Sequence, residues 1–339
     1  MNIHQQRTIF QWLHLAEGSA VLVALGMDLL GEPPTALHPV VWYGKLIDRL
    51  EQRAPYTPIP QLLYGILMLI LATPAAFIPA AFLHGIARSV RATCRRSGYT
   101  FLGSILYALI EGGSLKPLFA LRMLVDAGRL VRCSLEQQNL PAARAALFHL
   151  VSRDRSQLSE NLAAAAAIES LAENVSDAVV APLFYYMFFG LPGAAAYRLF
   201  NTFDSMIGYH GRYEFLGRAA ARLDDALNLL PSRLTALLII VLAPLFGGNR
   251  RTAWQVWRRD AGKTESPNAG HPMAAIAGAL EIQLEKVDHY RLGYARNALT
   301  PRHLRQAEQM VWWVGGSTIV LAALLKMLWR PSLWNRRRH

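Results

Sequence analysis

Two long apolar runs constrain this chain more than any other feature of its sequence. Residues 59–87 and 311–329 are rich in large aliphatic side chains, and both approach or exceed the length of about 20 residues with which a helix crosses a bilayer. Of the 339 residues, 53% are hydrophobic and only 17% are charged, against about 25% charged residues in a typical soluble domain. The sequence therefore predicts an integral membrane protein, with residues 311–329 as its C-terminal span.

Four further apolar stretches are shorter or interrupted. Residues 178–200 are long enough to cross a membrane, but Gly190 and Pro192 break them. Apolar stretches of about 10–14 residues are more often buried, re-entrant or interfacial than spanning. If every stretch crossed, the polar motifs described below would lie on opposite sides of the membrane, so we expect some stretches to be re-entrant or broken. The other stretches are residues 16–30, 99–110 and 234–246.

The pattern between the apolar stretches predicts helices. Residues 115–177 are polar and lack the alternation that is typical of strands. Pro141 suits the first turn of one helix, and Asp154 with Gln157 resembles a capping pair that opens the next. We therefore expect an all-α fold in one membrane-embedded domain, residues 1–339. It would be a polytopic helical bundle with polar cytoplasmic helices and re-entrant or broken segments.

The net charge of +12 raises the question of nucleic-acid binding. Basic clusters follow apolar segments at residues 88–96, 250–259 and 336–338. Positive residues beside spans are retained on the cytoplasmic side and meet anionic lipid headgroups. No motif that reads nucleic acid accompanies them, so we expect membrane lipids and no nucleic acid as partners. Cys94 and Cys133 lack metal-type spacing and fit a reducing compartment, and we expect no cleaved signal peptide.

The strongest motif contains three carboxylates spaced four residues apart. Glu169, Glu173 and Asp177 would lie on one face of a helix, where like charges at this spacing repel. The motif leads directly into an apolar segment, where unpaired carboxylates are costly. A divalent cation would offset the repulsion, and oxygen ligands favour Mg²⁺ or Ca²⁺ over zinc. A solvated helix face is the alternative, which the adjoining membrane segment disfavours.

Two further polar clusters adjoin apolar runs. Asn201, Asp204 and Ser205 follow the broken stretch within about one helical turn. A helix cap would explain one of these side chains but not all three, so we favour a functional site. The third cluster combines acidic, amide and basic side chains, which a structural salt bridge would explain equally well: Arg222, Asp224, Asp225, Asn228 and Arg233.

Three weaker signals complete the set. Arg153 precedes an expected helix N-terminus, where phosphate is attracted by free N–H groups and by an arginine fork. His38 and Asn268 lie in Pro- and Gly-rich turns, whose first explanation is turn chemistry. The chain has no Walker A loop, no Gly-x-Gly-x-x-Gly loop and no His-Glu-x-x-His motif. A bound nucleotide would therefore need an unfamiliar kind of site.

Taken together, the polar motifs and several neighbouring segments resemble one family, the adenosylcobinamide-phosphate synthases of cobalamin biosynthesis. One departure is His271, which stands where the family pattern has Trp. A membrane family linked to β-lactamase induction shares the general layout but not the full set of polar motifs. The similar segments occur in the family's order: residues 29–40, 153–154, 169–177, 181–186, 190–208, 222–228, 231–233 and 266–270.

The resemblance implies an ATP-dependent ligase that forms an amide bond. Adenosylcobyric acid would be joined to (R)-1-amino-2-propanol phosphate, or to aminopropanol, through an acyl phosphate. A carboxylate needs such activation because its oxygen is a poor leaving group, and the protein then supplies mainly positioning and charge neutralisation. ATP and Mg²⁺ are the implied cofactors, with the corrinoid as substrate.

The resemblance also suggests a role for each candidate residue. Glu169, Glu173 and Asp177 would hold the Mg²⁺ of Mg²⁺-ATP. The catalytic carboxylates would be Asp204, which is also a further metal ligand, together with Asp224 and Asp225, one of which accepts the proton of the attacking amine. Binding of phosphate and substrate falls to polar and cationic side chains: His38, Arg153, Asn174, Asn201, Ser205, Arg222, Asn228, Arg233 and Asn268.

The sequence leaves two other classes of membrane protein open. A Gly/Pro-broken segment beside Asp and Asn is also typical of transporters, although the chain has few clear spans and no matched halves. A non-catalytic sensor related to the β-lactamase-inducing proteins is the second alternative. The resemblance places the enzyme in the cell membrane, as a multi-pass protein whose active site faces the cytoplasm. It also allows a homo-oligomer and contacts with other membrane-bound late cobalamin enzymes.

Overall fold

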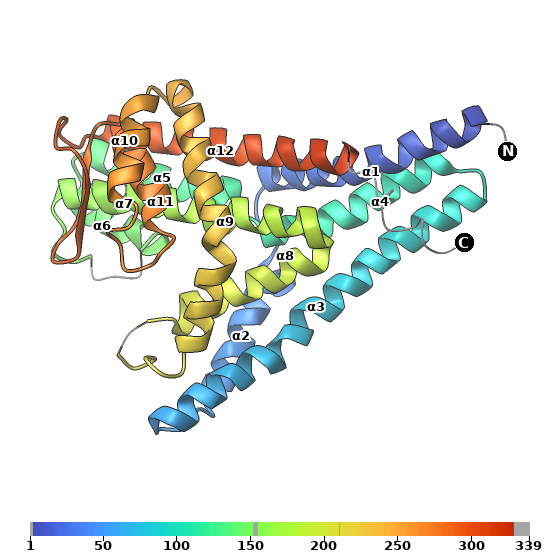
Figure 1. Cartoon of the computed structure of the whole chain (residues 1–339), viewed down its shortest axis with the longest axis horizontal. Helices are drawn as coiled ribbons and strands as arrows, with labels where there is room; N and C mark the ends of the chain where they lie inside the picture. The colour runs from blue at the N-terminus through green and yellow to red at the C-terminus, as the bar shows by residue number, and fades with distance from the viewer. Residues whose placement is uncertain (1–2, 152–154, 210, 329–339) are drawn as a thin grey trace.

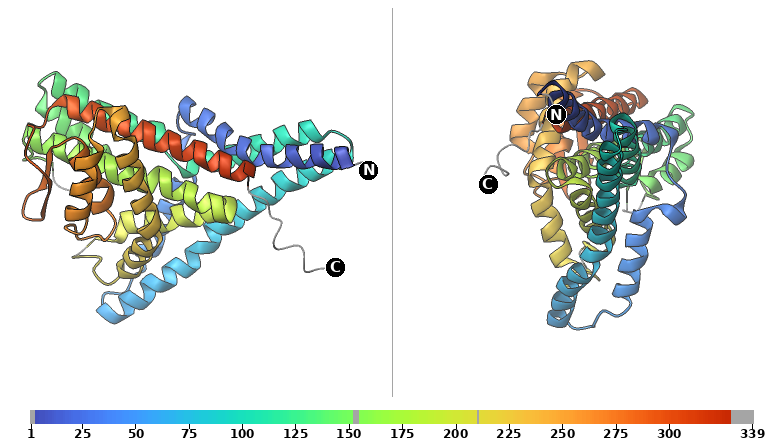
Figure 2. Two further views of the ribbon diagram at one scale, coloured as in Figure 1. Left: turned by 45° about the horizontal axis from the view of Figure 1, so that its top comes forward. Right: turned by 90° about the vertical axis from the view of Figure 1, so that its right-hand side faces the viewer.

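The computed structural model describes residues 3–151, 155–209 and 211–328, with side chains from residue 15 onward. Most of these residues are helical, and several helices follow the long axis of the molecule (Figures 1 and 2). α1 packs against α4 and α12, and α3 packs against α4 and α8. The expected all-α fold is confirmed.

The elements have the following bounds. The long helices are α1 (Ile3–Leu30), α3 (Pro58–Arg96), α8 (Ala181–Ile207), α9 (Arg218–Leu242) and α12 (Pro301–Leu328). The shorter α-helices are α2 (Pro39–Glu51), α4 (Thr100–Leu115), α5 (Leu121–Glu136), α6 (Leu140–Ala146), α7 (Glu160–Val175), α10 (Arg250–Asp260) and α11 (Gly270–Ala279). Short turns of other types are η1 (Thr35–Leu37), η2 (Lys116–Leu118), η3 (Leu147–His149), η4 (Ser176–Val180) and η5 (Ala243–Phe246).

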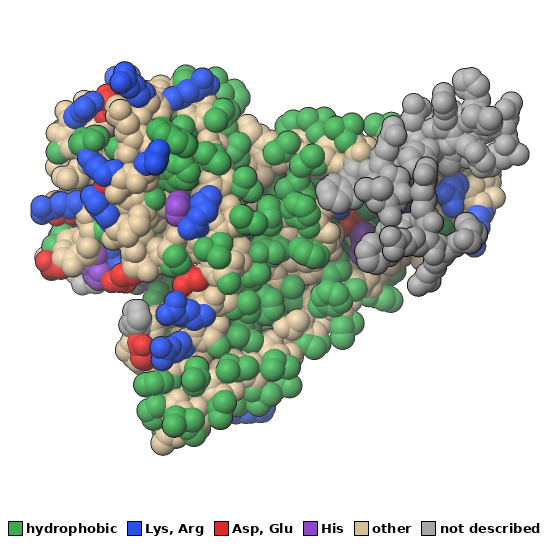
Figure 3. All heavy atoms as spheres, viewed as in Figure 1, with side chains coloured by type: hydrophobic (Ala, Val, Ile, Leu, Met, Phe, Trp, Pro, Cys, Tyr) green, Lys and Arg blue, Asp and Glu red, His purple; other side chains and the backbone are tan. Residues whose placement is uncertain are grey.

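Within the described ranges, 5 helical segments are long and apolar enough to cross a membrane. Large apolar side chains cover the outside of α3, where Leu63, Ile70 and Phe82 are 62%, 62% and 67% exposed. Hydrophobic side chains also cover much of the face drawn in Figure 3. An exposed apolar surface of this kind needs lipid or another apolar partner. The segments are Pro58–Arg96, Thr100–Glu136, Glu160–Ile207, Arg218–Phe246 and Pro301–Leu328.

Two stretches that we expected to be too short for spans belong to longer helical segments. Residues 234–246 form the second half of α9 with η5, and residues 99–110 lie almost wholly within α4, which η2 follows directly; α5 begins after the non-helical Phe119 and Ala120. In both segments the helix extends beyond the apolar run into polar residues that pack inside the protein. The length of an apolar run therefore underestimates the length of the helix when one end of that helix faces a polar interior.

The broken stretch forms a helical hairpin within α8. Gly190 has φ 66° and ψ −160°, a backbone conformation outside the helical region, and the chain reverses there (Figure 1). The Tyr197 hydroxyl lies 3.4 Å from the carbonyl oxygen of Asp177. A continuous helix would separate residues 20 positions apart by about 30 Å. The prediction of a broken segment is therefore confirmed.

Within the polar residues 115–177, one of the two predicted helix starts is confirmed. α6 begins beside Pro141, and the Asn139 side chain accepts a hydrogen bond from the Ala142 amide at 3.0 Å. The predicted capping pair at Asp154 and Gln157 is wrong as a helix start, since α7 begins later. Ser159 caps it instead, accepting from the Leu162 amide at 3.4 Å; Asp154 itself lies outside the described residues.

A short β-hairpin was not expected. β1 (Gln283–Lys286) pairs antiparallel with β2 (Tyr290–Gly293). Leu284 and Leu292 face each other across the ladder, and both are fully buried. Each strand has four residues, which is too short for alternation to stand out from the sequence.

The basic clusters at residues 88–96 and 250–259 lie at opposite ends of the molecule. The first is at the corner between α3 and α4, whereas the second is on α10 (Figure 1). The expectation that both clusters are held on the cytoplasmic side stays a prediction. The third cluster, residues 336–338, lies outside the described residues.

Candidate functional site

A polar cavity of about 540 Å³ lies where the inner end of α7, η4, the second half of α8 and the first half of α9 meet. The loop before α11 and the β-hairpin close its remaining sides. The hairpin in α8 creates this cavity, because it returns Asn201 and Asp204 to the level of Asp177. The predicted clusters therefore meet, although they lie far apart along the helices.

Five predicted carboxylates line the cavity: Glu173, Asp177, Asp204, Asp224 and Asp225. Asp224 is buried and accepts hydrogen bonds from two amide side chains, Asn201 at 3.3 Å and Asn228 at 2.9 Å. These contacts fix the orientation of its carboxylate. Asp225 accepts a hydrogen bond from the Ser266 hydroxyl at 3.2 Å.

The other three carboxylates have no protein donor among the described residues. Glu173, Asp177 and Asp204 are partly buried and face the same cavity. Buried or half-buried carboxylates normally accept hydrogen bonds or pair with cations, because desolvated charge is costly. A ligand that brings positive charge or hydrogen-bond donors into the cavity would satisfy them.

The predicted amide and hydroxyl side chains also line the cavity, and most are held by neighbouring groups. Asn174 donates to the carbonyl and hydroxyl oxygens of Ser170, both at 2.9 Å. Asn268 donates to the backbone carbonyl of Asp225 at 2.7 Å. Asn228 accepts from the Tyr197 hydroxyl at 2.9 Å, and Ser205 donates to the Asn201 carbonyl at 2.8 Å. The structure therefore brings together Asn174, Asn201, Ser205, Asn228 and Asn268.

Of the predicted arginines, Arg222 and Arg233 do not line the cavity. Arg233 donates to the Asn268 side-chain oxygen at 3.0 Å and so holds that amide in place. Arg222 is exposed on α9. Arg153 lies outside the described residues.

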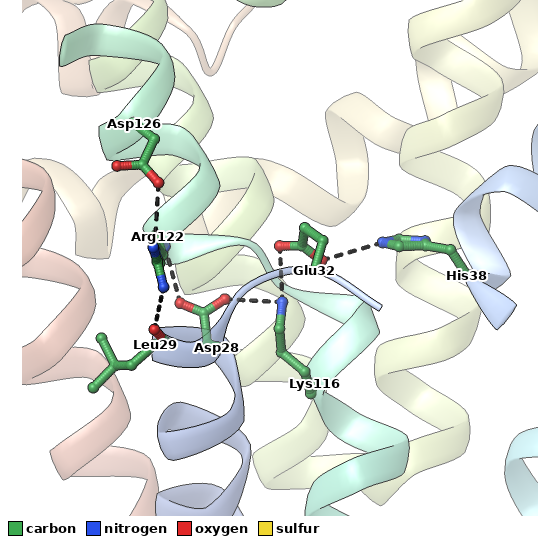
Figure 4. Close-up of polar contacts among 7 residues, drawn as sticks. All are labelled: Asp28, Leu29, Glu32, His38, Lys116, Arg122 and Asp126. Carbon is green, nitrogen blue, oxygen red and sulfur yellow. Dashed lines mark hydrogen bonds and ion pairs between the residues drawn. The ribbon is translucent and has the colours of Figure 1, made fainter. Parts of the chain in front are cut away.

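His38 belongs to a different network, at the end of α1 (Figure 4). Its Nε2 lies 3.4 Å from Glu32, and Glu32 lies 2.8 Å from the Lys116 ammonium. Lys116 also contacts the fully buried Asp28 at 3.0 Å. Burial acts to raise the pKa of Glu32, but the contacts with His38 and Lys116 lower it below its usual value. This network fastens the loop between α1 and α2, and His38 does not reach the cavity lining.

Glu169 lines a second, smaller cavity of about 160 Å³ together with Glu173. Eight residues of α-helix separate Glu169 from Asp177 by about 12 Å. A single Mg²⁺ binds oxygen at about 2.1 Å, so it cannot take all three predicted carboxylates. Consistent with this, the described residues contain no group of three His, Cys, Asp or Glu side chains close enough to hold a metal ion.

The donor set nevertheless fits a magnesium ion that arrives with a ligand. Mg²⁺ is usually bound through one or two protein carboxylates, while substrate phosphates and waters supply the other positions. Glu173, Asp177 and Asp204 offer such carboxylates without competing protein donors in the described part of the chain.

Sequence reasoning missed several lining residues. Lys286 and Tyr290 come from the β-hairpin, and Thr264 from the loop before α11. None of them lies in a motif, so only the tertiary structure reveals them. His271, the departure from the family pattern, accepts a hydrogen bond from the Trp257 indole at 2.9 Å. Burial and the nearby Arg233 guanidinium lower the pKa of His271 to about 4, so it is neutral and able to accept.

The comparison with known proteins identifies a family. The family model described as CobD/Cbib protein matches residues 21–311. The chain belongs to the CobD/CbiB family. No solved structure is significantly similar to it.

Relatives of this CobD/CbiB protein cover most of its length. A protein of Dehalococcoides mccartyi named cobalamin biosynthesis protein CobD is 44% identical over 285 residues, which is 83% of this chain and 88% of the relative. A probable cobalamin biosynthesis protein CobD of Methanothermobacter thermautotrophicus is 39% identical, over 87% of this chain and 93% of the relative. A cobalamin biosynthesis protein CobD of Geobacter metallireducens is 40% identical, over 80% of this chain and 83% of the relative. The family resemblance expected from the motifs is confirmed.

Proposed function

We propose that this CobD/CbiB protein acts in cobalamin biosynthesis as an ATP-dependent ligase. It would join adenosylcobyric acid to (R)-1-amino-2-propanol phosphate, or to aminopropanol, through an amide bond. The observation that carries this proposal is the acidic cavity, in which carboxylates and asparagines from α7, η4, α8 and α9 converge. Family membership supplies the substrate class, because several relatives are named for cobalamin biosynthesis.

The reaction follows from the chemistry of a carboxylate. A propionate oxygen of the corrinoid attacks the γ-phosphate of ATP, and ADP leaves. The amine nitrogen then attacks the acyl carbon, and phosphate leaves with one of the former carboxylate oxygens. Both steps gather negative charge on phosphoryl oxygens, so positioning and charge neutralisation supply most of the catalysis.

Three carboxylates suit the nucleotide. Glu173, Asp177 and Asp204 face the cavity without protein donors among the described residues, and one or two of them would bind nucleotide phosphates through Mg²⁺. When bound, Mg²⁺ supplies charge neutralisation at the β- and γ-phosphates. The asparagine amides of the cavity wall can donate to substrate oxygens.

Asp225 is the better placed of the two proton acceptors. Both oxygens of Asp224 already accept hydrogen bonds, from Asn201 and Asn228, so this carboxylate is engaged in holding the two amides. In the described structure, Asp225 accepts one side-chain hydrogen bond, from Ser266. We therefore assign proton removal from the attacking amine to Asp225, and orientation of the two amides to Asp224.

The products of ATP test this proposal. The purified enzyme should release ADP and phosphate only when both the corrinoid and the amine are present. With ¹⁸O in the corrinoid carboxylate, one labelled oxygen should appear in inorganic phosphate, as measured by mass spectrometry. Label in AMP would indicate adenylylation instead. ATP consumption without the two substrates, or none with them, would favour a transporter or a sensor over a ligase.

We further propose that the cavity opens to the cytoplasm, where ATP is supplied. Cysteines introduced at Ser205 and Ser266, after replacement of Cys94 and Cys133, should resist an impermeant thiol reagent added outside intact cells. Both line the cavity, so they should behave alike. Permeabilised cells serve as the positive control, in which both should react. Labelling of either cysteine from outside would place the cavity on the other side.

A further inference from the structure

The β-hairpin contributes to the lining of both cavities. The larger cavity of about 540 Å³ and the smaller one of about 160 Å³ share four lining residues: Leu150, Glu173, Lys286 and Tyr290. Lys286 and Tyr290 face each other as the last pair of the β-ladder. Both side chains therefore stand at the boundary between the cavities.

The hairpin that carries Lys286 is firmly anchored. Leu284 and Leu292 are fully buried beneath the ladder, and β1 packs against α7. The turn is closed by a hydrogen bond from the His289 amide to the Lys286 carbonyl at 3.0 Å. The position of the Lys286 backbone is therefore determined by the fold, whereas its side chain reaches into the site.

Lys286 is the only cationic side chain that lines either cavity in the described structure. In the same ranges, no carboxylate lies within the 4.0 Å of an ion pair to its ammonium, although Glu173 is near enough to interact electrostatically. Surface lysines often pair with nothing, but this one is partly buried among carboxylates. A cation that forms no ion pair with a described residue is available to an anionic ligand.

We propose that Lys286 binds a phosphate group of a substrate at the boundary between the two cavities. The inference rests on the proposed function, whose substrates carry phosphate on the nucleotide and on the amine. A lysine ammonium is a compact point charge that commonly binds phosphate. Lys286 would thus supply positive charge that Arg222 and Arg233 do not bring to the cavity lining.

Variants of Lys286 test the proposal. Lys286→Met should raise KM for the phosphate-bearing substrate roughly 10- to 100-fold, as expected for a lost hydrogen bond to a charged group. Lys286→Arg should recover much of this loss because it keeps the charge. Arg291→Met is the matched control, since Arg291 lies on the same hairpin, is exposed and pairs with Glu285 at 2.7 Å. It should leave KM unchanged.

Separate measurements identify which phosphate is bound. A rise in KM for aminopropanol phosphate, with KM for aminopropanol unchanged, supports binding of the amine's phosphate. A rise in KM for ATP supports binding of the nucleotide. The proposal is overturned if Lys286→Met changes neither the KM for aminopropanol phosphate nor the KM for ATP. It is also overturned if the KM for ATP is unchanged and the KM values for aminopropanol phosphate and aminopropanol rise equally.

Binding without turnover separates this inference from the proposed function. Aminopropanol phosphate and ATP should each be titrated against the thermal unfolding of wild-type protein and of Lys286→Met. Loss of stabilisation by either ligand in the variant supports the proposal even if the wild type forms no amide. Equal stabilisation of both proteins overturns it. Unfolding of the unliganded variants shows whether the substitution has damaged the fold.

Discussion

Glu173→Gln should lower turnover by about 100-fold or more while leaving the protein folded. Glu173 lines both cavities, and no described residue donates a hydrogen bond to its carboxylate. The substitution keeps the shape of the side chain and removes the charge that would attract Mg²⁺. Because like charges crowd this cavity, removing one should leave the unfolding temperature unchanged or raise it. Active sites commonly trade stability for activity in this way.

The measurement is a Mg²⁺ titration of turnover beside thermal unfolding in detergent. Glu160→Gln is the matched control, since Glu160 lies exposed in the first turn of the same helix. It should keep wild-type turnover. Near-normal activity of Glu173→Gln across the Mg²⁺ series would remove Glu173 from the metal site. Loss of the folded protein would instead assign the carboxylate a structural role.

Gly190→Ala should destabilise the hairpin of α8 by about 1–3 kcal/mol, the usual cost of a strained backbone conformation. Gly190 has φ 66° and ψ −160°, a region essentially restricted to glycine. A Cβ there would meet no atom closer than 3.8 Å, so the cost arises from the backbone and not from a clash. Turnover should fall as well, because a displacement of about 1 Å in a site can cost about 100-fold.

Thermal unfolding and turnover of Gly190→Ala should be compared with those of Gly316→Ala. A Cβ at Gly316, in α12, would meet nothing within 4 Å, and its φ is not in the left-handed region. That control should be neutral or stabilising by up to about 1 kcal/mol. Equal behaviour of the two variants would show that the special backbone conformation of Gly190 does not hold the site together.

Much of this protein could be predicted from the sequence because the relevant signals are local. Apolar runs at 59–87 and 311–329 indicated membrane helices, and both lie within long helices as far as the structure describes them. The break at Gly190 was visible because Gly and Pro interrupt an otherwise apolar stretch. Spacing of polar residues beside apolar runs selected most of the acidic and amide side chains that line the cavity, and their order indicated the family.

Other features depended on the tertiary structure. The α8 hairpin reverses the chain, so that Asp204 and Asp177 line the same cavity. The sequence shows where the helix is broken but not the direction in which the chain continues after the break. Spacing of four residues grouped Glu169 with Asp177, yet the rise of the helix separates them, and Glu169 lines the smaller cavity. Lys286 belongs to no motif, and a short hairpin carries it into the site. Local patterns thus determine which residues are polar and helical, whereas chain reversals and packing decide which of them meet, because those contacts join residues far apart in the sequence.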